Sequence, residues 1–171
     1  MNKLLDEGNL QFDFSTCHIV ERFDDRQVNP YGMKAVDFIA EDTEHLYFIE
    51  VKDFQNPKAT EERRKTDYEM LIAAGTEKKS IFSLEMGSKI KDSLLRKYSL
   101  GEEITKSVIY LLLVNLDKLG AFERGLLQVK ISGHVPTGLN KDNFCKFTNI
   151  SFDLVDLKQL EAYGITCTVK Q

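Results

Sequence analysis

Cysteine is scarce in this sequence, and the few that occur form no pattern. Only three of the 171 residues are cysteines, Cys17, Cys145 and Cys167, and they are odd in number and widely spaced. This spacing suits neither a disulfide framework nor a cysteine-based zinc site. We expect each to be a small apolar residue in a reducing compartment.

Long apolar segments are also missing. The N-terminus carries no apolar stretch that would indicate a signal peptide, and the apolar run at residues 108–114 is too short to cross a bilayer. We therefore expect a cytoplasmic protein that does not associate with membranes.

Excess positive charge and several familiar catalytic motifs are absent as well. The net charge of −4 argues against binding nucleic acid through bulk charge, although it is compatible with a local basic face. The sequence has no glycine-rich phosphate loop and no G-x-S-x-G elbow. Its histidines, His18, His45 and His134, are scattered and lack a cysteine or acid at ligand spacing.

What the sequence does contain is enough apolar material for one folded domain. Hydrophobic residues make up 42% of the chain and charged residues 29%, which is typical of an ordinary globular protein. With this length we expect a single domain over residues 1–171.

The chain is organised around residues 33–54, which are predicted to form a β-hairpin. Two apolar runs rich in Val, Ile, Phe and Tyr, residues 35–40 and 46–51, flank a polar break at residues 41–45. Apolar runs of this length, bounded by turn-forming residues, are typical of paired strands.

Three charged residues interrupt this hairpin. If Ala40 pairs with Tyr47, Asp37 lies opposite Glu50, and Lys52 shares a face with Glu50. Opposed carboxylates destabilise a sheet unless a cation lies between them. Replacing either acid by alanine is therefore expected to abolish binding of a divalent ion and to leave the fold intact or more stable. An alternative interpretation is a structural ion pair between Lys52 and one of the acids.

The residues around the hairpin predict alternating strands and helices. Residues 9–14 alternate as a strand, whereas residues 15–23 fit either a short helix or a strand. Thr60 followed by two acids predicts a helix start. Residues 80–98 predict an amphipathic helix whose apolar stripe packs on the sheet, and the stripe contains Ile81, Leu84, Ile90 and Leu94.

The second half of the chain continues the alternation. Residues 107–115 are nearly unbroken apolar, which indicates a strand buried on both faces, and the helix before it suggests a crossover to a parallel neighbour. Residues 116–128 predict another helix, residues 150–155 a strand, and residues 165–169 a last strand. Asp156 is predicted to cap a short helix that stops at Gly164.

Asp37, followed after a hairpin by Glu50-Val51-Lys52, resembles the motif of the PD-(D/E)XK phosphodiesterases. The resemblance covers the motif hairpin closely and the order of elements to about Asn115 loosely. Val36 stands where the name of the motif has proline. The resemblance implies an α/β (α+β) fold with a mixed central sheet flanked by helices, as in the restriction-endonuclease core.

The chemistry of these residues points to a divalent cation. Carboxylates such as Asp37 and Glu50 select hard cations, so Mg²⁺ or Mn²⁺ is the expected ligand. Lys52 would orient the attacking water or stabilise developing charge, and it could act as a base only if burial lowered its pKa. By the resemblance, the main-chain carbonyl of Val51 adds a metal ligand. Glu21 is the best upstream candidate for a third acid, although it could equally be a surface residue.

Lysines of the predicted helix at residues 80–98 offer a contact to phosphate. We expect Lys89 or Lys91 to approach the acidic face of the hairpin. The leading hypothesis is a metal-dependent nuclease that hydrolyses phosphodiester bonds of nucleic acid, with DNA expected ahead of RNA. The rival is a non-catalytic binding or assembly protein with a nuclease-like fold, and a homodimer or another protein partner is compatible with either.

Overall fold

The computed structural model describes residues 3–24, 32–78, 80–138 and 149–170. Cys145 and residues 25–31 lie outside the described residues. None of the described helices combines the length and the apolar character that crossing a membrane requires.

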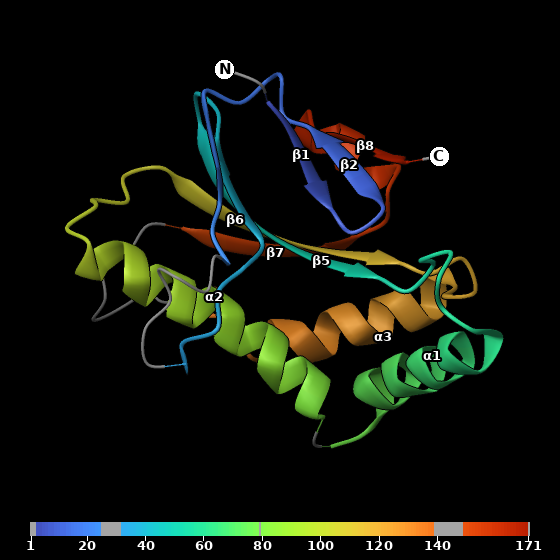
Figure 1. Ribbon diagram of the computed structural model, residues 1–171. Helices are drawn as coiled ribbons and strands as arrows, with labels where there is room; N and C mark the ends of the chain where they lie inside the picture. Colours follow the sequence, from blue (N-terminus) through green and yellow to red (C-terminus); the bar gives the residue numbers. More distant parts are fainter. Residues whose placement is uncertain (1–2, 25–31, 79, 139–148, 171) are drawn as a thin grey trace.

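A five-stranded mixed sheet forms the middle layer (Figure 1). Its strand order is β3-β4-β5-β6-β7, in which β3, β4 and β5 are antiparallel neighbours and β5, β6 and β7 are parallel. The predicted hairpin and the predicted parallel crossover are therefore confirmed. The strands are β3 (Ile19–Arg22), β4 (Phe38–Glu41), β5 (His45–Asp53), β6 (Ser107–Asn115) and β7 (Ile150–Val155).

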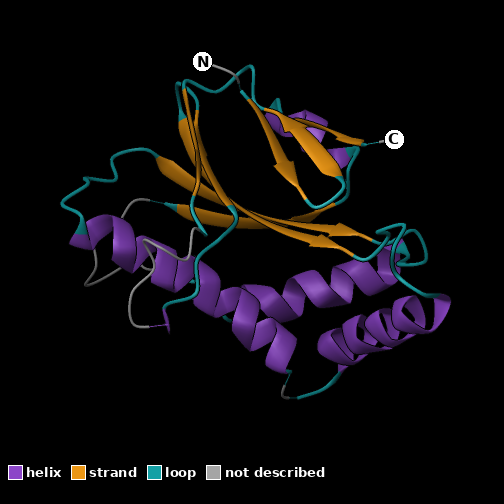
Figure 2. Ribbon diagram, in the orientation of Figure 1, coloured by secondary structure: helices purple, strands orange, loops and turns teal. Residues whose placement is uncertain are grey.

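Three helices cover one face of this sheet (Figure 2). They are α1 (Glu61–Thr76), α2 (Ile81–Ser99) and α3 (Ala121–Ser132). Thr60 and Ser80 cap α1 and α2 by accepting backbone N–H bonds from Arg63 and Ser83, which satisfies donors that a helix start leaves free. α1 and α2 form the connection between the parallel strands β5 and β6.

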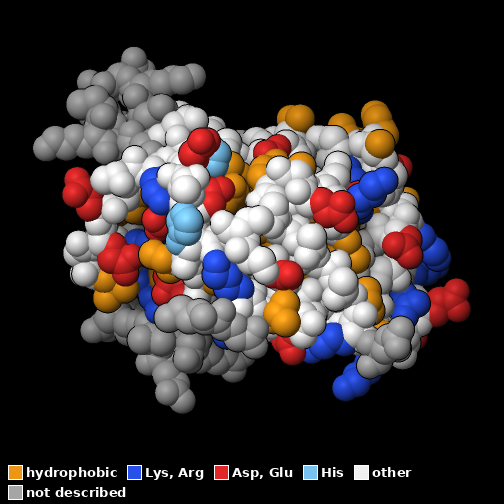
Figure 3. All heavy atoms as spheres, turned by 90° about the horizontal axis from the view of Figure 1, so that it is seen from above, with side chains coloured by type: hydrophobic (Ala, Val, Ile, Leu, Met, Phe, Trp, Pro, Cys, Tyr) orange, Lys and Arg blue, Asp and Glu red, His pale blue; other side chains and the backbone are white. Residues whose placement is uncertain are grey.

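A smaller sheet and a short helix cover the opposite face (Figure 1). The small sheet has the order β1-β2-β8 and joins the N-terminal segment to the C-terminal one. Acidic, basic and apolar side chains are interspersed over the described part of its outer side (Figure 3). These elements are β1 (Leu4–Glu7), β2 (Leu10–Asp13), β8 (Thr166–Val169) and the 3₁₀ helix η4 (Gln159–Tyr163).

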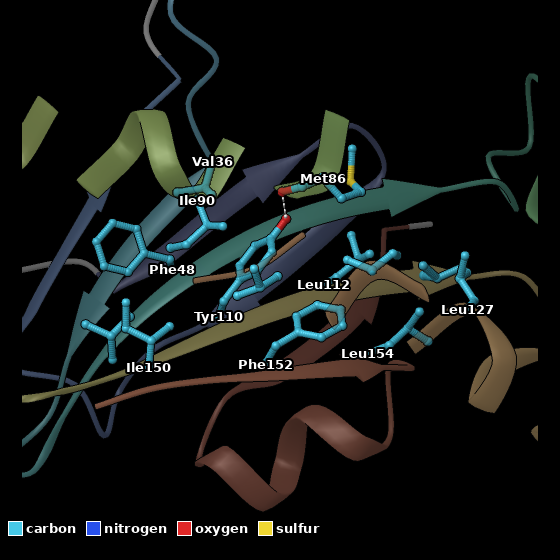
Figure 4. Packing of buried hydrophobic residues seen from close by; sticks show 14 of the residues in the cluster. Val36, Phe48, Met86, Ile90, Tyr110, Leu112, Leu127, Ile150, Phe152 and Leu154 are labelled. Carbon is cyan, nitrogen blue, oxygen red and sulfur yellow. Dashed lines mark hydrogen bonds between the residues drawn. The ribbon is translucent and has the colours of Figure 1, made fainter. Parts of the chain in front are cut away.

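Two apolar cores result, one on each face of the middle sheet. The helix-side core includes Tyr110 and Phe152, whose rings lie side by side, and the Tyr110 hydroxyl donates to the Met86 carbonyl at 3.0 Å (Figure 4). The core under the small sheet includes Phe12 and Phe38. β6 contributes alternate side chains to both cores, which explains its unbroken apolar sequence.

The predicted stripe of α2 is wrong in part. Ile90 and Leu94 are buried as expected, but Ile81 is 86% exposed and Leu84 is 49% exposed. The buried face runs instead through Phe82, Met86, Ile90, Ser93, Leu94 and Lys97. Around the helix, Ile81 lies about 100° from Phe82, and Leu84 lies about 160° from Met86. A helix that buries Phe82 and Met86 therefore turns Ile81 and Leu84 outward.

Other differences are small. Residues 15–23, for which the sequence allowed either a helix or a strand, contain the strand β3. The helix α3 begins at Ala121 rather than at residue 116. β1 was not predicted. The short C-terminal helix is a 3₁₀ turn: the Asp156 carboxylate accepts the Gln159 N–H at 2.8 Å, and Gly164 ends it with a φ of 71°.

Candidate functional site

The register of the hairpin places the two acids across from each other. Ala40 pairs with Tyr47, as predicted, and Phe38 pairs with Ile49. Asp37 directly precedes β4, so continuing this antiparallel register by one residue sets it opposite Glu50.

Both acids are buried on the helix-covered face. Glu50 is 0% exposed and Asp37 is 7% exposed. Side chains alternate along β5, so Glu50 shares a face with Phe48, which belongs to the helix-side core, while Val51 belongs to the core under the small sheet. Charged carboxylates at such depth need cations or donors close by.

Two lysines supply positive charge to Glu50. The Nζ atoms of Lys52 and Lys89 each lie 2.7 Å from Glu50 Oε1. Lys52 comes from the same strand, whereas Lys89 reaches down from α2. Within the described residues, Glu50 Oε2 is buried and has no hydrogen-bond partner.

Asp37 is held by the main chain of β5. The Val51 N–H donates to Asp37 Oδ2 over 2.6 Å. Because the N–H and C=O groups of one strand residue face the same edge, the Val51 carbonyl is also directed to the β4 side. The carbonyl that the resemblance suggests as a ligand therefore faces the edge at which Asp37 lies.

Burial and charge alter the acid–base properties of the site. Burial, together with repulsion from Glu50, raises the pKa of Asp37 to about 7, and Lys89 and the Val51 N–H only moderate this rise. Burial alone would lower the pKa of Lys52, but the charge of Glu50 and its hydrogen bond raise it overall. Lys52 is therefore an ammonium group, and the role of a general base that required a lowered pKa is disfavoured.

Two side chains of α2 that the sequence did not single out fix the backbone ahead of Asp37. Ser93 Oγ accepts the Val36 N–H at 3.0 Å, and Asp92 Oδ2 accepts the Lys34 N–H at 2.9 Å. The sequence signals Ser93 only weakly, as a polar residue that interrupts the apolar face of the helix, and it does not signal Asp92. Tyr110 also lies close enough to both acids for their charges, after burial, to raise its pKa well above the ordinary value.

The remaining predicted residues lie elsewhere. The Glu21 carboxylate is 3.3 Å from Lys97 Nζ and lines a separate cavity of about 300 Å³ with Glu41 and Lys106. Lys91 is exposed. The two lysines differ because a two-residue step turns about 200° around a helix, so Lys89 facing the sheet directs Lys91 to solvent.

The few oxygen donors at this position suit Mg²⁺ or Mn²⁺ with bound waters, rather than an ion that protein ligands enclose completely. In the described parts of the chain, no group of three or more acid, histidine or cysteine side chains could hold a metal. Asp37, Glu50 and the Val51 carbonyl remain, together with the unpaired Glu50 Oε2. Mg²⁺ commonly takes one or two carboxylates and keeps several waters, so these residues fit it.

Comparison with known proteins adds nothing to this geometry, since no family model, no curated protein and no solved structure matches the chain.

Proposed function

We propose that the protein is a metal-dependent nuclease that hydrolyses phosphodiester bonds of nucleic acid, with DNA expected ahead of RNA. The observation that carries the proposal is the convergence of Asp37, Glu50, Lys52 and Lys89 at one buried position of the hairpin. Two opposed acids with two lysines are more than a simple ion pair requires.

The architecture supports this proposal. An antiparallel β3-β4-β5 unit, two helices and the parallel strand β6 follow one another, and the motif residues lie on β5 and directly before β4. This order is what the resemblance to the PD-(D/E)XK phosphodiesterases implies for a restriction-endonuclease-like core.

The residues divide the work by their chemistry. Asp37, Glu50 and the Val51 carbonyl would hold the divalent cation. When bound, such an ion lowers the pKa of water and neutralises charge on phosphoryl oxygens. Lys52 stays protonated, so it orients the attacking water by donating a hydrogen bond or stabilises developing negative charge. Lys89 is the lysine of α2 placed to contact a phosphate.

Cleavage assays test the proposal. Single- and double-stranded DNA and RNA are incubated with the protein and Mg²⁺ or Mn²⁺, in parallel with Asp37→Asn, Glu50→Gln and Lys52→Ala. Glu44→Gln, in the exposed turn of the same hairpin, is the matched control. We expect metal-dependent cleavage that the three site variants lose and the control keeps. Cleavage that persists in all variants would refute the assignment.

A non-catalytic assembly protein is the second candidate, and the outer face of α2 favours it. Ile81, Leu84 and Leu95 are all exposed there, which is unusual for a helix that also buries an apolar face. Sedimentation at several concentrations tests it. This candidate would be favoured if wild type forms a dimer, if the double variant Ile81→Ser and Leu95→Ser is a monomer, and if neither metal supports cleavage.

A further inference from the structure

Glu50 has two ammonium groups at the same oxygen, and only one of them belongs to its own strand. Lys52 lies two residues along β5 on the same face, so its position follows from the strand. Lys89 belongs to α2, and its Nζ reaches the same Oε1 at 2.7 Å. The contact is therefore one that the packing of helix on sheet creates.

The Lys89 ammonium also acts on the second carboxylate. Its charge lowers the pKa of Asp37 against the opposing effects of burial and Glu50. Lys89 is thus in direct contact with Glu50, one of the two acids that would hold the proposed metal. The side chain is 15% exposed, so its long stem has a path to solvent.

Charge balance makes the Lys89 ammonium and a divalent metal compete for the two acids. Asp37 and Glu50, when ionised, carry two negative charges, and Lys52 and Lys89 carry two positive ones. Adding a divalent cation would leave an excess of positive charge in a buried position, where like charges repel strongly. Release of one ammonium group to solvent relieves that excess.

We propose that Lys89 is a built-in counter-ion of Glu50 that leaves this carboxylate when a divalent metal binds. This inference rests on the metal site of the proposed function. It adds that metal binding and phosphate binding are coupled: Lys89 is engaged with Glu50 in the metal-free protein and becomes available to a phosphate only once released.

Titration with Mn²⁺, followed by calorimetry on the full chain, tests the competition without any substrate. Lys89→Met removes the charge and keeps an unbranched side chain that is one atom shorter, and Lys91→Met is the matched control on the exposed side of the same helix. We expect Lys89→Met to bind Mn²⁺ about tenfold more tightly than wild type and Lys91→Met to equal wild type. Equal or weaker binding by Lys89→Met overturns the counter-ion role.

A second measurement does not depend on any variant remaining folded. The side-chain ammonium resonances of ¹⁵N-labelled wild-type protein are followed while Mg²⁺ is added. The Lys89 signal should shift or broaden as Glu50 is released, whereas the Lys91 signal stays in place. Saturable metal binding with an unmoved Lys89 signal refutes the inference and leaves the metal site standing. No Mn²⁺ or Mg²⁺ binding by any of the proteins would instead refute the metal site, and the counter-ion role with it.

Discussion

The two faces of the middle sheet are built differently. The core under the small sheet is apolar, with Phe12, Phe14 and Phe38 in ring contact. The helix-covered face buries Asp37 and Glu50 among its apolar residues. Buried charge costs free energy that apolar residues do not, so the helix-covered face combines its apolar core with a destabilising site, whereas the other core is apolar.

The largest expected effect comes from breaking the apolar face. Phe12→Ala should reduce the free energy of unfolding by about 3–5 kcal/mol, because the ring is fully buried against Phe38 and leaves a cavity. Urea unfolding measures this. Val169→Ala, half-exposed on the neighbouring strand β8, should cost less than 1 kcal/mol. A small loss for Phe12→Ala would mean that the small sheet does not stabilise the fold.

On the helix-covered face, replacing Glu50 and replacing Asp37 by alanine should change the free energy of unfolding by different amounts. The hairpin pattern alone treats them alike, but Glu50 neutralises both lysines while Asp37 accepts a main-chain N–H. We expect Glu50→Ala to cost about 3 kcal/mol in the metal-free protein, since two partly exposed ammonium groups lose their partner.

Asp37→Ala should leave stability unchanged or raised, because the burial of its charge is relieved. Thermal unfolding without metal, with Glu44→Ala as control, compares the two. Equal losses for both acids would contradict this asymmetry.

The pH dependence of stability should report Asp37. Its pKa is about 7 when folded, above the ordinary value of 3.8, so the folded state binds the proton more tightly than the unfolded chain. The stabilisation from protonated Asp37 is full below about pH 4 and is lost as pH rises through 7. The loss is of the order of 2–4 kcal/mol.

Urea unfolding of the metal-free protein between pH 4 and 8 measures this loss. Asp37→Asn should remove most of the slope between pH 5 and 7. A slope that persists in this variant would assign it to other groups.

The sequence predicted the fold where local pattern decides it. The period-2 alternation and the Ala40–Tyr47 register placed Asp37 opposite Glu50 without any tertiary information, and the structure has this register. The unbroken apolar run of β6 correctly indicated burial on both faces. Both features leave a pattern in residues that are neighbours in the chain.

What depends on helix rotation could not be predicted as well. A stripe through Ile81 and Leu84 and one through Phe82 and Met86 fit the same segment of α2, and only packing against the sheet selects the second. The choice between Lys89 and Lys91 and the roles of Ser93 and Asp92 follow from that selection. Glu21 lies opposite Ile39 in the sheet and pairs with Lys97 of α2, a contact between distant segments that local pattern does not encode.

The smallest expected effect tests whether α2 positions the site. Ser93→Ala removes the acceptor of the Val36 N–H, one residue before Asp37, at a fully buried position. An unsatisfied buried N–H should cost about 1 kcal/mol and let Asp37 shift, which we expect to weaken Mn²⁺ binding several-fold. Ser88→Ala is the matched control, because that hydroxyl donates to the Leu84 carbonyl of its own helix.

Calorimetric Mn²⁺ titration and urea unfolding of both serine variants measure the two effects. The control should be neutral or slightly stabilised, since alanine is the better helix former. Equal behaviour of the two variants would show that the contact of α2 with Val36 does not matter. A loss of stability in Ser93→Ala with unchanged Mn²⁺ affinity would show that β5, through the Val51 N–H, positions Asp37 without the helix.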